Sequence, residues 1–335
     1  MPVSGFPYKT FARGWYQVGW SKEFEPGTVR PGKYFEKDVV IYRANSGKMV
    51  VLDAHCRHMG AHLGYGGTVA GDDIVCPFHA WKWNDKGKNI EIPYSKQECV
   101  NATLRSWPVI EKGGLVLIWY HPENQQPDFE PNEVPEFSDP DYYPVYPHGA
   151  TKDVVSFPPQ LLSENGIDWP HLKYVHHWDA GDFGCESYED RGNSFHIKIF
   201  GAIKTNRGVA QIRSVMTKWG VGLNYAKLSG LRDYGFAIGM TPIDQTHTEI
   251  RLSSAVKRKA GDTSDVPDKF ATALHGGQIT EILTEKFGGD RLIWEHLAYQ
   301  TKPLLVPEEA AGTHALRRWM DKFYQDARFP AKAQG

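Results

Sequence analysis

The amino-acid sequence predicts an α+β protein in two parts: a small antiparallel β domain, then an α+β domain with an antiparallel sheet and a C-terminal helix. Three observations support this prediction. The chain has 335 residues, which is more than one hydrophobic core usually serves. A proline-rich acidic segment divides it at residues 121–147. Short β-type runs come before that segment, and longer alternating runs and a helical pattern come after it.

The first domain, residues 1–120, contains short runs of β-branched and aromatic residues. DVVIYR at 38–43 and KMVVLD at 48–53 are joined by ANSG, and GLVLIWYH follows at 114–121. Such runs, separated by turn residues, predict antiparallel strands. Two loops rich in Cys, His and Gly lie between them, so we expect a β scaffold with projecting ligand loops.

The dividing segment, residues 121–147, reads HPENQQPDFEPNEVPEFSDPDYYPVYP. It holds seven prolines and seven acidic residues, and no Lys or Arg. Proline lacks a backbone N–H and disrupts helix interiors and central strands. We therefore predict no helix and no central strand here, and interpret the segment as a surface linker between the domains.

The second domain, residues 148–335, resumes the alternating pattern. AQIRSVMTKW at 210–219, GFAIGMTPI at 235–243 and HTEIRLSSAV at 247–256 place every second side chain on one face. This alternation is typical of a half-buried antiparallel sheet.

A helical pattern follows the sheet, from Pro267 to Phe287. Proline is favoured near a helix start, which supports this boundary. One apolar stripe is expected to contain Phe270, Leu274, Ile282 and Leu283.

The composition excludes several classes of protein. A formal net charge of −2 gives no electrostatic reason to expect a nucleic-acid partner. The start of the chain lacks a signal-peptide pattern, and the apolar run LVLIWY is far shorter than the roughly 20 residues that span a bilayer. Four cysteines do not resemble a secreted disulfide framework. We therefore expect a cytoplasmic protein without a membrane span.

The two loops of the first domain carry one thiol and one imidazole each. The pattern is Cys-x-His, seventeen residues, then Cys-x-x-His, through Cys56, His58, Cys76 and His79. Such a set can hold one tetrahedral zinc, or a two-iron two-sulfur cluster with thiolates on one iron and imidazoles on the other. Zinc motifs usually pair Cys with Cys and His with His. One of each per loop therefore favours the iron–sulfur cluster.

A second metal centre is suggested by ENGIDWPHLKYVHHW at 164–178. It offers Asp168, His171 and His176, and two His with one carboxylate typically hold mononuclear non-haem iron. The two histidines lie about 140° apart around a regular helix. Both reach one metal only if the helix ends or widens between them. The alternative is a His-rich aromatic helix packed on the sheet.

Together the two motifs resemble those of the Rieske non-haem iron oxygenases, and more narrowly of the oxygenase component of 3-ketosteroid 9α-hydroxylase and related desaturases. The resemblance covers most of the chain and is thin between about 180 and 265. It rests on FARGWY, DAHCRHMGAHLG, CPFHAWKWNDKGK, IPYS, LRSWPV, GLVLIWYHPE, ENGIDWPHLKYVH, GGDRLIWEHLAY and RRWMDKFY.

The resemblance implies a fold of the helix-grip type and a set of ligands. The cluster ligands it implies are Cys56, His58, Cys76 and His79. The iron ligands it implies are His171, His176 and Asp290.

For the third ligand, Asp290 could have another role, and another carboxylate could bind the metal in its place. As GGD precedes RLIWEH, Asp290 can also be a helix N-cap, and Glu285 or Glu295 would then be the next candidates. The chain departs from the family pattern at Gly288 and Gly289, where bulkier or acidic residues are usual, and this raises the question of helix continuity.

The resemblance also implies two supporting residues and an assembly. Asp168 would connect His171 with the cluster ligand His79 of a neighbouring subunit in a head-to-tail homotrimer. Asn165 would lie beside the iron ligands. Either residue could instead be an ordinary helix-start residue.

The implied activity is that of a terminal oxygenase. It would use O₂ to hydroxylate a bulky apolar ring substrate, such as a 3-ketosteroid. Desaturation or O-demethylation by the same iron is an alternative, and a Rieske electron-transfer module is an alternative of another class. A separate flavin and iron–sulfur reductase or ferredoxin would supply electrons, because the chain has no G-x-G-x-x-G fingerprint. Apolar residues that agree with such a substrate are Phe195, Phe200, Met216, Trp219, Tyr225, Phe236 and Met240.

Overall fold

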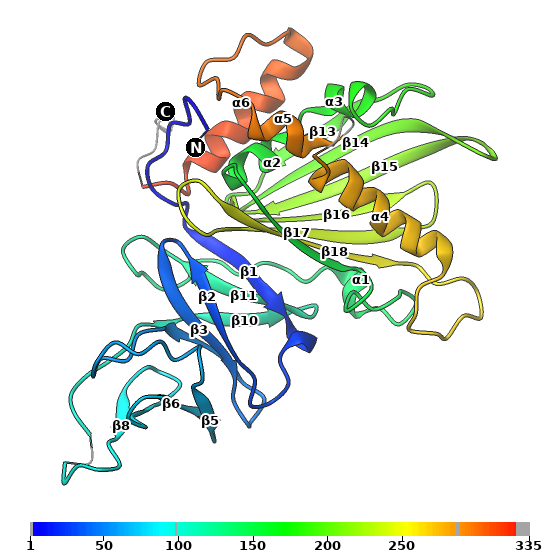
Figure 1. The fold of residues 1–335 in the computed structure, drawn as a ribbon. Helices are drawn as coiled ribbons and strands as arrows, with labels where there is room; N and C mark the ends of the chain where they lie inside the picture. The colour runs from blue at the N-terminus through cyan, green and yellow to red at the C-terminus, as the bar shows by residue number, and fades with distance from the viewer. Residues whose placement is uncertain (1–2, 98, 286–288, 326–335) are drawn as a thin grey trace. The chain divides into compact units, whose positions relative to one another are not determined.

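The computed structural model describes residues 3–97, 99–285 and 289–325 and divides into two compact units (Figure 1). One unit is Val18–Tyr120. The other combines the residues up to Gln17 with those from His121 onward. From the sequence, the first residues are expected in the first domain and residues 121–147 form a separate linker. Both segments instead belong to the larger unit.

The smaller unit consists of short antiparallel strands. A four-stranded sheet has the order β2-β3-β4-β9, a second has β5-β6-β7-β8, and in a three-stranded sheet β11 lies between β1 and β10. The strands are β1 (Gly14–Trp20), β2 (Val29–Tyr34), β3 (Lys37–Arg43), β4 (Met49–Asp53), β5 (Thr68–Ala70), β6 (Asp73–Val75), β7 (Lys82–Trp83), β8 (Asn89–Glu91), β9 (Ser106–Trp107), β10 (Val109–Lys112) and β11 (Leu115–Tyr120), with a 3₁₀ turn at Ser21–Glu23.

The predicted β-type runs of this unit form the expected antiparallel strands. DVVIYR lies in β3 and KMVVLD in β4, with Val40 opposite Leu52. Both side chains are fully buried, together with Trp83 and Leu63, in the core from which the Cys/His loops emerge. The β scaffold therefore follows from the pattern of β-branched residues.

The larger unit is built on a seven-stranded antiparallel sheet of order β12-β18-β17-β16-β15-β14-β13 (Figure 1). The α+β prediction, with an antiparallel sheet after the β domain, is confirmed. The strands are β12 (Ala150–Val155), β13 (Gly184–Asp190), β14 (Ser194–Thr205), β15 (Gly208–Trp219), β16 (Leu223–Ser229), β17 (Tyr234–Pro242) and β18 (Thr248–Val256).

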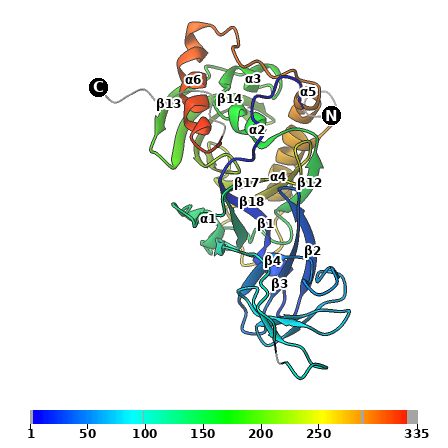
Figure 2. The same ribbon diagram turned by 90° about the vertical axis from the view of Figure 1, so that its left-hand side faces the viewer.

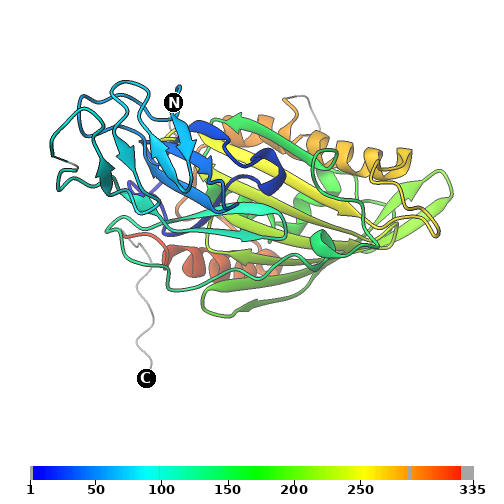
Figure 3. The same ribbon diagram turned by 90° about the horizontal axis from the view of Figure 1, so that it is seen from below.

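Helices lie around this sheet. The long helix α4 runs along one face of the sheet, as Figure 2 and Figure 3 show from two sides. No helix within residues 3–97, 99–285 and 289–325 is long and apolar enough to cross a membrane. The helices are α1 (Pro135–Ser138), α2 (Pro159–Asn165), α3 (Trp169–Tyr174), α4 (Lys269–Leu283), α5 (Asp290–Glu295) and α6 (Pro307–Asp321).

The proline-rich segment differs from its prediction. It contains the single-turn helix α1, which begins at a proline, where no N–H is needed. Val134, Tyr142 and Tyr143 are buried, and Glu136 lies against Gly235 of β17. The segment thus packs against the sheet at β17. Strand β18 is buried on both faces rather than half-buried, as its alternation suggested.

Helix α4 is shorter than predicted. It begins after the N-cap Asp268, whose carboxylate accepts the N–H of Ala271, and it ends at Leu283. The predicted end, Phe287, lies outside the described residues. Phe270, expected in the apolar stripe, is 41% exposed and lies beneath the guanidinium of Arg232. The buried face instead contains Ala271, His275, Gln278, Ile282 and Leu283.

Candidate metal centres and their cavity

The two Cys/His loops of the smaller unit have the same backbone turn. The N–H of Cys56 donates to the carbonyl of Ala61 at 2.9 Å, and the N–H of Cys76 donates to that of Trp81, also at 2.9 Å. Each cysteine is therefore held by a bond that closes its own loop. Two equivalent loops present their side chains in the same way, as the repeated Cys-plus-His pattern suggests.

The fifth residue of each loop has a left-handed backbone. Gly60 has φ +79° and Ala80 has φ +58°. Their N–H groups donate to the carbonyls of Cys56 at 2.9 Å and Cys76 at 3.0 Å. For alanine this conformation costs roughly 1 kcal/mol or more. The strain at Ala80 is therefore the cost of closing the second loop in the same shape as the first.

Two thiols and two imidazoles gather at the ends of these loops. Cys56 and Cys76 are buried, and burial together with the neighbouring Cys76 raises the pKa of the Cys56 thiol. The rings of His58 and His79 lie 4.7 Å apart, edge to face, and His58 stacks on Trp81 at 4.6 Å. Nδ1 of His58 is buried and has no hydrogen-bond partner within the described ranges. An unsatisfied buried nitrogen beside two thiols fits a metal ligand.

The neighbouring histidines have ordinary hydrogen bonds. His55 contacts the carboxylate of Asp38 and the carbonyl of Gly60, both at 3.0 Å. Nδ1 of His62 accepts the N–H of Gly64 at 3.0 Å. Neither ring is needed to complete the group of four.

Large apolar side chains surround the two loops at the surface of the smaller unit. Their exposed fractions are high for residues of this kind: Met59 66%, Tyr65 69%, Phe78 58% and Tyr94 62%. Contiguous exposed apolar groups commonly mark protein–protein contacts.

The second centre depends on where α3 ends. The helix stops at Tyr174, with Val175 as its C-cap, so His171 lies on the helix and His176 lies beyond it. His177 then reverses the chain with φ +58°. The helix thus ends between the two histidines, which is the condition under which both can face one point.

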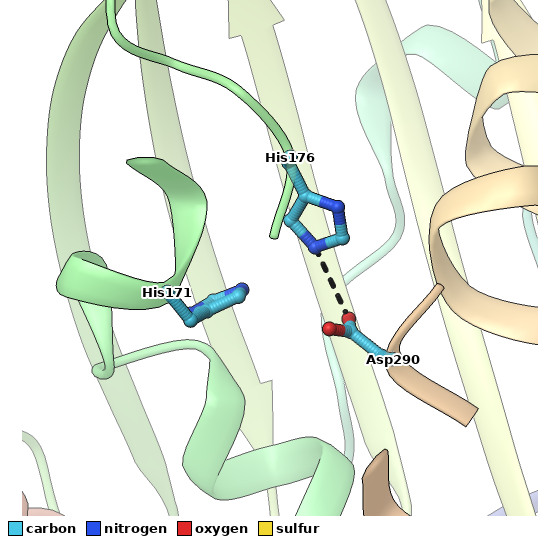
Figure 4. A group of neighbouring side chains, drawn as sticks. All are labelled: His171, His176 and Asp290. Atoms are coloured by element: carbon cyan, nitrogen blue, oxygen red, sulfur yellow. Dashed lines mark hydrogen bonds and ion pairs between the residues drawn. The ribbon is translucent and has the colours of Figure 1, made fainter. Parts of the chain in front are cut away.

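His171, His176 and Asp290 converge at that point (Figure 4). Their potential ligand atoms all lie within 4.8 Å of one another. Nε2 of His176 is 3.3 Å from Oδ2 of Asp290, and the two imidazole rings are 5.1 Å apart. Nδ2 of Asn165 lies between them and donates to Oδ2 of Asp290 and Nε2 of His171, each at 3.0 Å.

The backbone orients His171. Nδ1 of this ring donates to the carbonyl of Asp168, which leaves the lone pair of Nε2 directed at Asn165 and Asp290. The carboxylate of Asp168 is 3.9 Å from Nδ1 and half exposed. Within the chain, the bond from His171 is therefore made to the carbonyl of Asp168 rather than to its side chain.

Asp290 does not cap its helix. Gly289 is the N-cap of α5, and Asp290 is the first helical residue, with a side chain only 4% exposed. The alternative ligands Glu285 and Glu295 each form an ion pair with Arg291 at 3.1 Å. The geometry therefore leaves Asp290 as the carboxylate that meets the two histidines.

Gly289 is one of the two departures from the family pattern. Glycine is needed at this position for a steric reason. A Cβ at this position would lie 2.6 Å from the carbonyl oxygen of Thr284 and 2.2 Å from its methyl group. Only glycine lets the start of α5 approach the end of α4 this closely. The other departure, Gly288, lies outside the described residues.

The three converging side chains line a cavity of about 230 Å³ between the sheet and α4. Its floor consists of rows of residues that lie opposite one another on neighbouring strands. The rows are Ile199–Ser214–Leu228–Tyr234, Met216–Ala226–Phe236 and Lys218–Asn224–Ile238. Of the apolar residues expected from sequence, Met216, Tyr225 and Phe236 line the cavity.

Two titratable groups in this cavity were not predicted from the sequence. Lys218 is 1% exposed, and burial lowers its pKa to about 7. Glu281, on α4, lies near His176 and Asp290, and burial raises its pKa. Lys218 occupies the buried phase of AQIRSVMTKW, together with Met216, and that position was the available signal.

Comparisons with known proteins agree with this organisation. Residues 14–108 match the Rieske [2Fe-2S] domain, and residues 118–324 match the 3-ketosteroid 9alpha-hydroxylase C-terminal domain. A probable 3-ketosteroid-9-alpha-monooxygenase, oxygenase component, of Rhodococcus rhodochrous is 30% identical over 96% of this chain and 82% of its own. Cholesterol 7-desaturase nvd of Hemicentrotus pulcherrimus is 27% identical over 94% of this chain and 70% of its own. The resemblance drawn from the motifs is confirmed.

Solved structures share the fold. Dicamba monooxygenase bound to dicamba superimposes with a TM-score of 0.72 at 18% identity, over 94% of this chain and 98% of that one. NdmB of Pseudomonas putida CBB5 has a TM-score of 0.65 at 16% identity, over 92% of this chain and 89% of that one. At this identity the likeness is one of fold alone.

Proposed function

The chain belongs to the 3-ketosteroid 9α-hydroxylase family of Rieske oxygenases, and on that premise we propose that it hydroxylates a 3-ketosteroid or a related steroid. It is the oxygenase component of such a monooxygenase, with a Rieske cluster and a mononuclear non-haem iron, and it depends on a separate reductase. The cluster supplies single electrons, and the iron, when bound, supplies oxygen activation next to the substrate.

The cluster ligands in this proposal are the four side chains at the ends of the loops: Cys56, His58, Cys76 and His79. Two observations support the assignment. The loops share one turn geometry, so each offers a thiol and an imidazole in the same way. The buried Nδ1 of His58 lacks any other partner among the described residues.

The iron ligands in this proposal are His171, His176 and Asp290. One observation carries it: the three potential ligand atoms lie within 4.8 Å of one another in the wall of a largely apolar cavity. Nδ1 of His171 is bonded to the carbonyl of Asp168, so the lone pair of Nε2, which accepts the amide of Asn165 here, is the one that would face a metal. Two imidazoles and one carboxylate are the donor set that Fe(II) oxygenases use.

Two further residues support these ligands in the proposal. Asn165 positions the carboxylate of Asp290 and the ring of His171 through its side-chain amide. Asp168, half exposed and next to His171, would accept a hydrogen bond from His79 of a neighbouring subunit in a homotrimer. The exposed apolar residues around the cluster loops favour such a contact. We also place the protein in the cytoplasm.

The cavity favours a bulky apolar substrate. Aliphatic and aromatic side chains form most of its floor, so burial of a ring skeleton is favourable and water is excluded from the reacting carbon. The relatives named as 3-ketosteroid monooxygenases support a ketosteroid, and the relative named as a cholesterol desaturase supports desaturation as the second candidate.

Product mass tests the proposal. We expect purified protein, with a reductase and O₂, to convert a 3-ketosteroid to a product with one additional oxygen atom, labelled when ¹⁸O₂ is supplied. Loss of two hydrogens instead would indicate a desaturase. Iron analysis gives a second criterion: about three atoms per chain are expected for an oxygenase, and two for an electron-transfer module.

A further inference from the structure

A buried lysine in the cavity has no partner. Lys218 of β15 lines the cavity and is 1% exposed. Across residues 3–97, 99–285 and 289–325, its ammonium group forms no hydrogen bond and no ion pair, and burial lowers its pKa to about 7. An ionisable group removed from water without compensation is costly, so its presence requires a reason beyond packing.

Gly166 defines where this ammonium group lies. A Cβ on Gly166 would be 2.7 Å from Nζ of Lys218 and 3.1 Å from its Cε, so the side chain passes directly over the glycine. Gly166 follows Asn165, whose amide contacts His171 and Asp290. Nζ therefore lies at the end of the cavity that adjoins the proposed iron ligands.

A second donor lies beside the lysine. Asn224 of β16 is directly opposite Lys218 in the sheet, lines the same cavity and is 6% exposed. Ser163 donates to its Oδ1 at 3.5 Å, which leaves the Nδ2 group as a donor. The adjacent row of the floor is apolar, with Met216 and Phe236. Lys218 and Asn224 thus place two polar donors side by side at one end of the apolar cavity floor.

We propose that Lys218 and Asn224 form an oxygen-binding subsite that receives a carbonyl oxygen of the substrate close to the carbon that is attacked. The inference deepens the proposed function and rests on it. A hydrogen bond from an ammonium group to a buried carbonyl is stronger than one between neutral groups. We take this oxygen to be that of a neutral ketone, because relatives of this chain are named as 3-ketosteroid monooxygenases.

The test compares the binding of a 3-ketosteroid and its 3-deoxy analogue. Trp178 and Trp294 line the cavity, so quenching of tryptophan fluorescence reports binding without turnover. In the wild type we expect the ketone to bind more tightly. In Lys218→Met, which keeps an unbranched side chain but removes the ammonium group, we expect that preference to fall about tenfold or more. Lys198→Met is the matched control, because Lys198 is an exposed lysine of β14 in the same sheet.

A second variant leaves the lysine in place. Gly166→Ala pushes the ammonium group away from its position, since the new Cβ would meet Nζ at 2.7 Å, and we expect the same loss of preference. Thermal unfolding and the iron content of the mononuclear site check that the larger unit of each variant is folded, because Lys218 and Gly166 both belong to that unit.

The outcomes separate the subsite from the function. An equal preference for the ketone in wild type and Lys218→Met overturns the subsite, even if the wild type oxygenates the steroid. A preference that depends on Lys218, without any oxygenated product, supports the subsite and overturns the proposed hydroxylation. A wild type that binds neither steroid, or both equally, overturns the subsite as well.

Discussion

Gly289→Ala should remove the mononuclear iron without touching a ligand. The new Cβ would lie 2.6 Å from the carbonyl oxygen of Thr284, whereas non-bonded heavy atoms are at their optimum near 3.5 Å, so α5 must move by about 1 Å. Metal and catalytic groups tolerate roughly 0.5 Å. We expect Asp290 to leave the converging group, product formation to fall about 100-fold and the free energy of unfolding to drop by about 1–3 kcal/mol.

Iron content and electron paramagnetic resonance measure this effect. The variant should hold about two iron atoms per chain instead of three, with an unchanged signal from the reduced Rieske cluster. Gly276→Ala is the control, because a Cβ on this glycine of α4 meets nothing within 4 Å. It should keep all the iron and gain up to about 1 kcal/mol in helix stability. A Gly289→Ala protein with full iron and wild-type turnover would refute the steric argument.

Three further predictions concern a proposed cluster ligand, the proposed contact between subunits, and helix α4 beside the cavity. His58→Ala should abolish the Rieske resonance signal, and an unchanged spectrum would exclude this ligand. Asp168→Asn should keep iron and cluster but slow product formation by orders of magnitude in single-turnover experiments, so a wild-type rate would leave Asp168 as a helix-start residue. Burial raises the pKa of Asp268, but the N–H of Ala271 and the ion pair with Arg232 outweigh it and lower that pKa to about 2. Asp268→Ala should therefore cost about 1 kcal/mol at neutral pH, and less as the pH falls from about 4 towards 2. Urea unfolding at pH 7 and pH 3 checks this, and equal costs would contradict it.

The chemistry of the site was more accessible from sequence than its surroundings. Thiol and imidazole spacing restricts the metals that a loop can hold, so Cys56 and His58 could be singled out without a structure. The helix end between His171 and His176 could be stated only as a condition for a metal site, because a regular helix directs the two rings apart. The type of donor atom and the spacing of the donors are local properties, so they can be recognised in a single sequence.

Packing between residues far apart in the sequence could not be predicted from such local patterns. The proline-rich segment looks like a linker by composition, yet Tyr142 and Tyr143 are buried because the sheet offers them a surface. Phe270 fits an apolar stripe, but Arg232 covers it at the surface instead. Lys218 reaches the cavity only through the register of β15 with its neighbours, and register is decided by tertiary contacts.

The larger unit is built from two stretches that lie far apart in the sequence, and this affects the order of folding during synthesis. The residues up to Gln17 are synthesised before the smaller unit, but their partners are synthesised after it: Tyr299 donates its N–H to the carbonyl of Ser4 at 2.7 Å, and Tyr8 donates to Asp321 at 2.9 Å. The smaller unit has all of its own strands long before those partners exist. Domains generally fold as units during synthesis. The smaller unit can therefore fold first. The residues up to Gln17 can pair only later, when the rest of the larger unit has been synthesised.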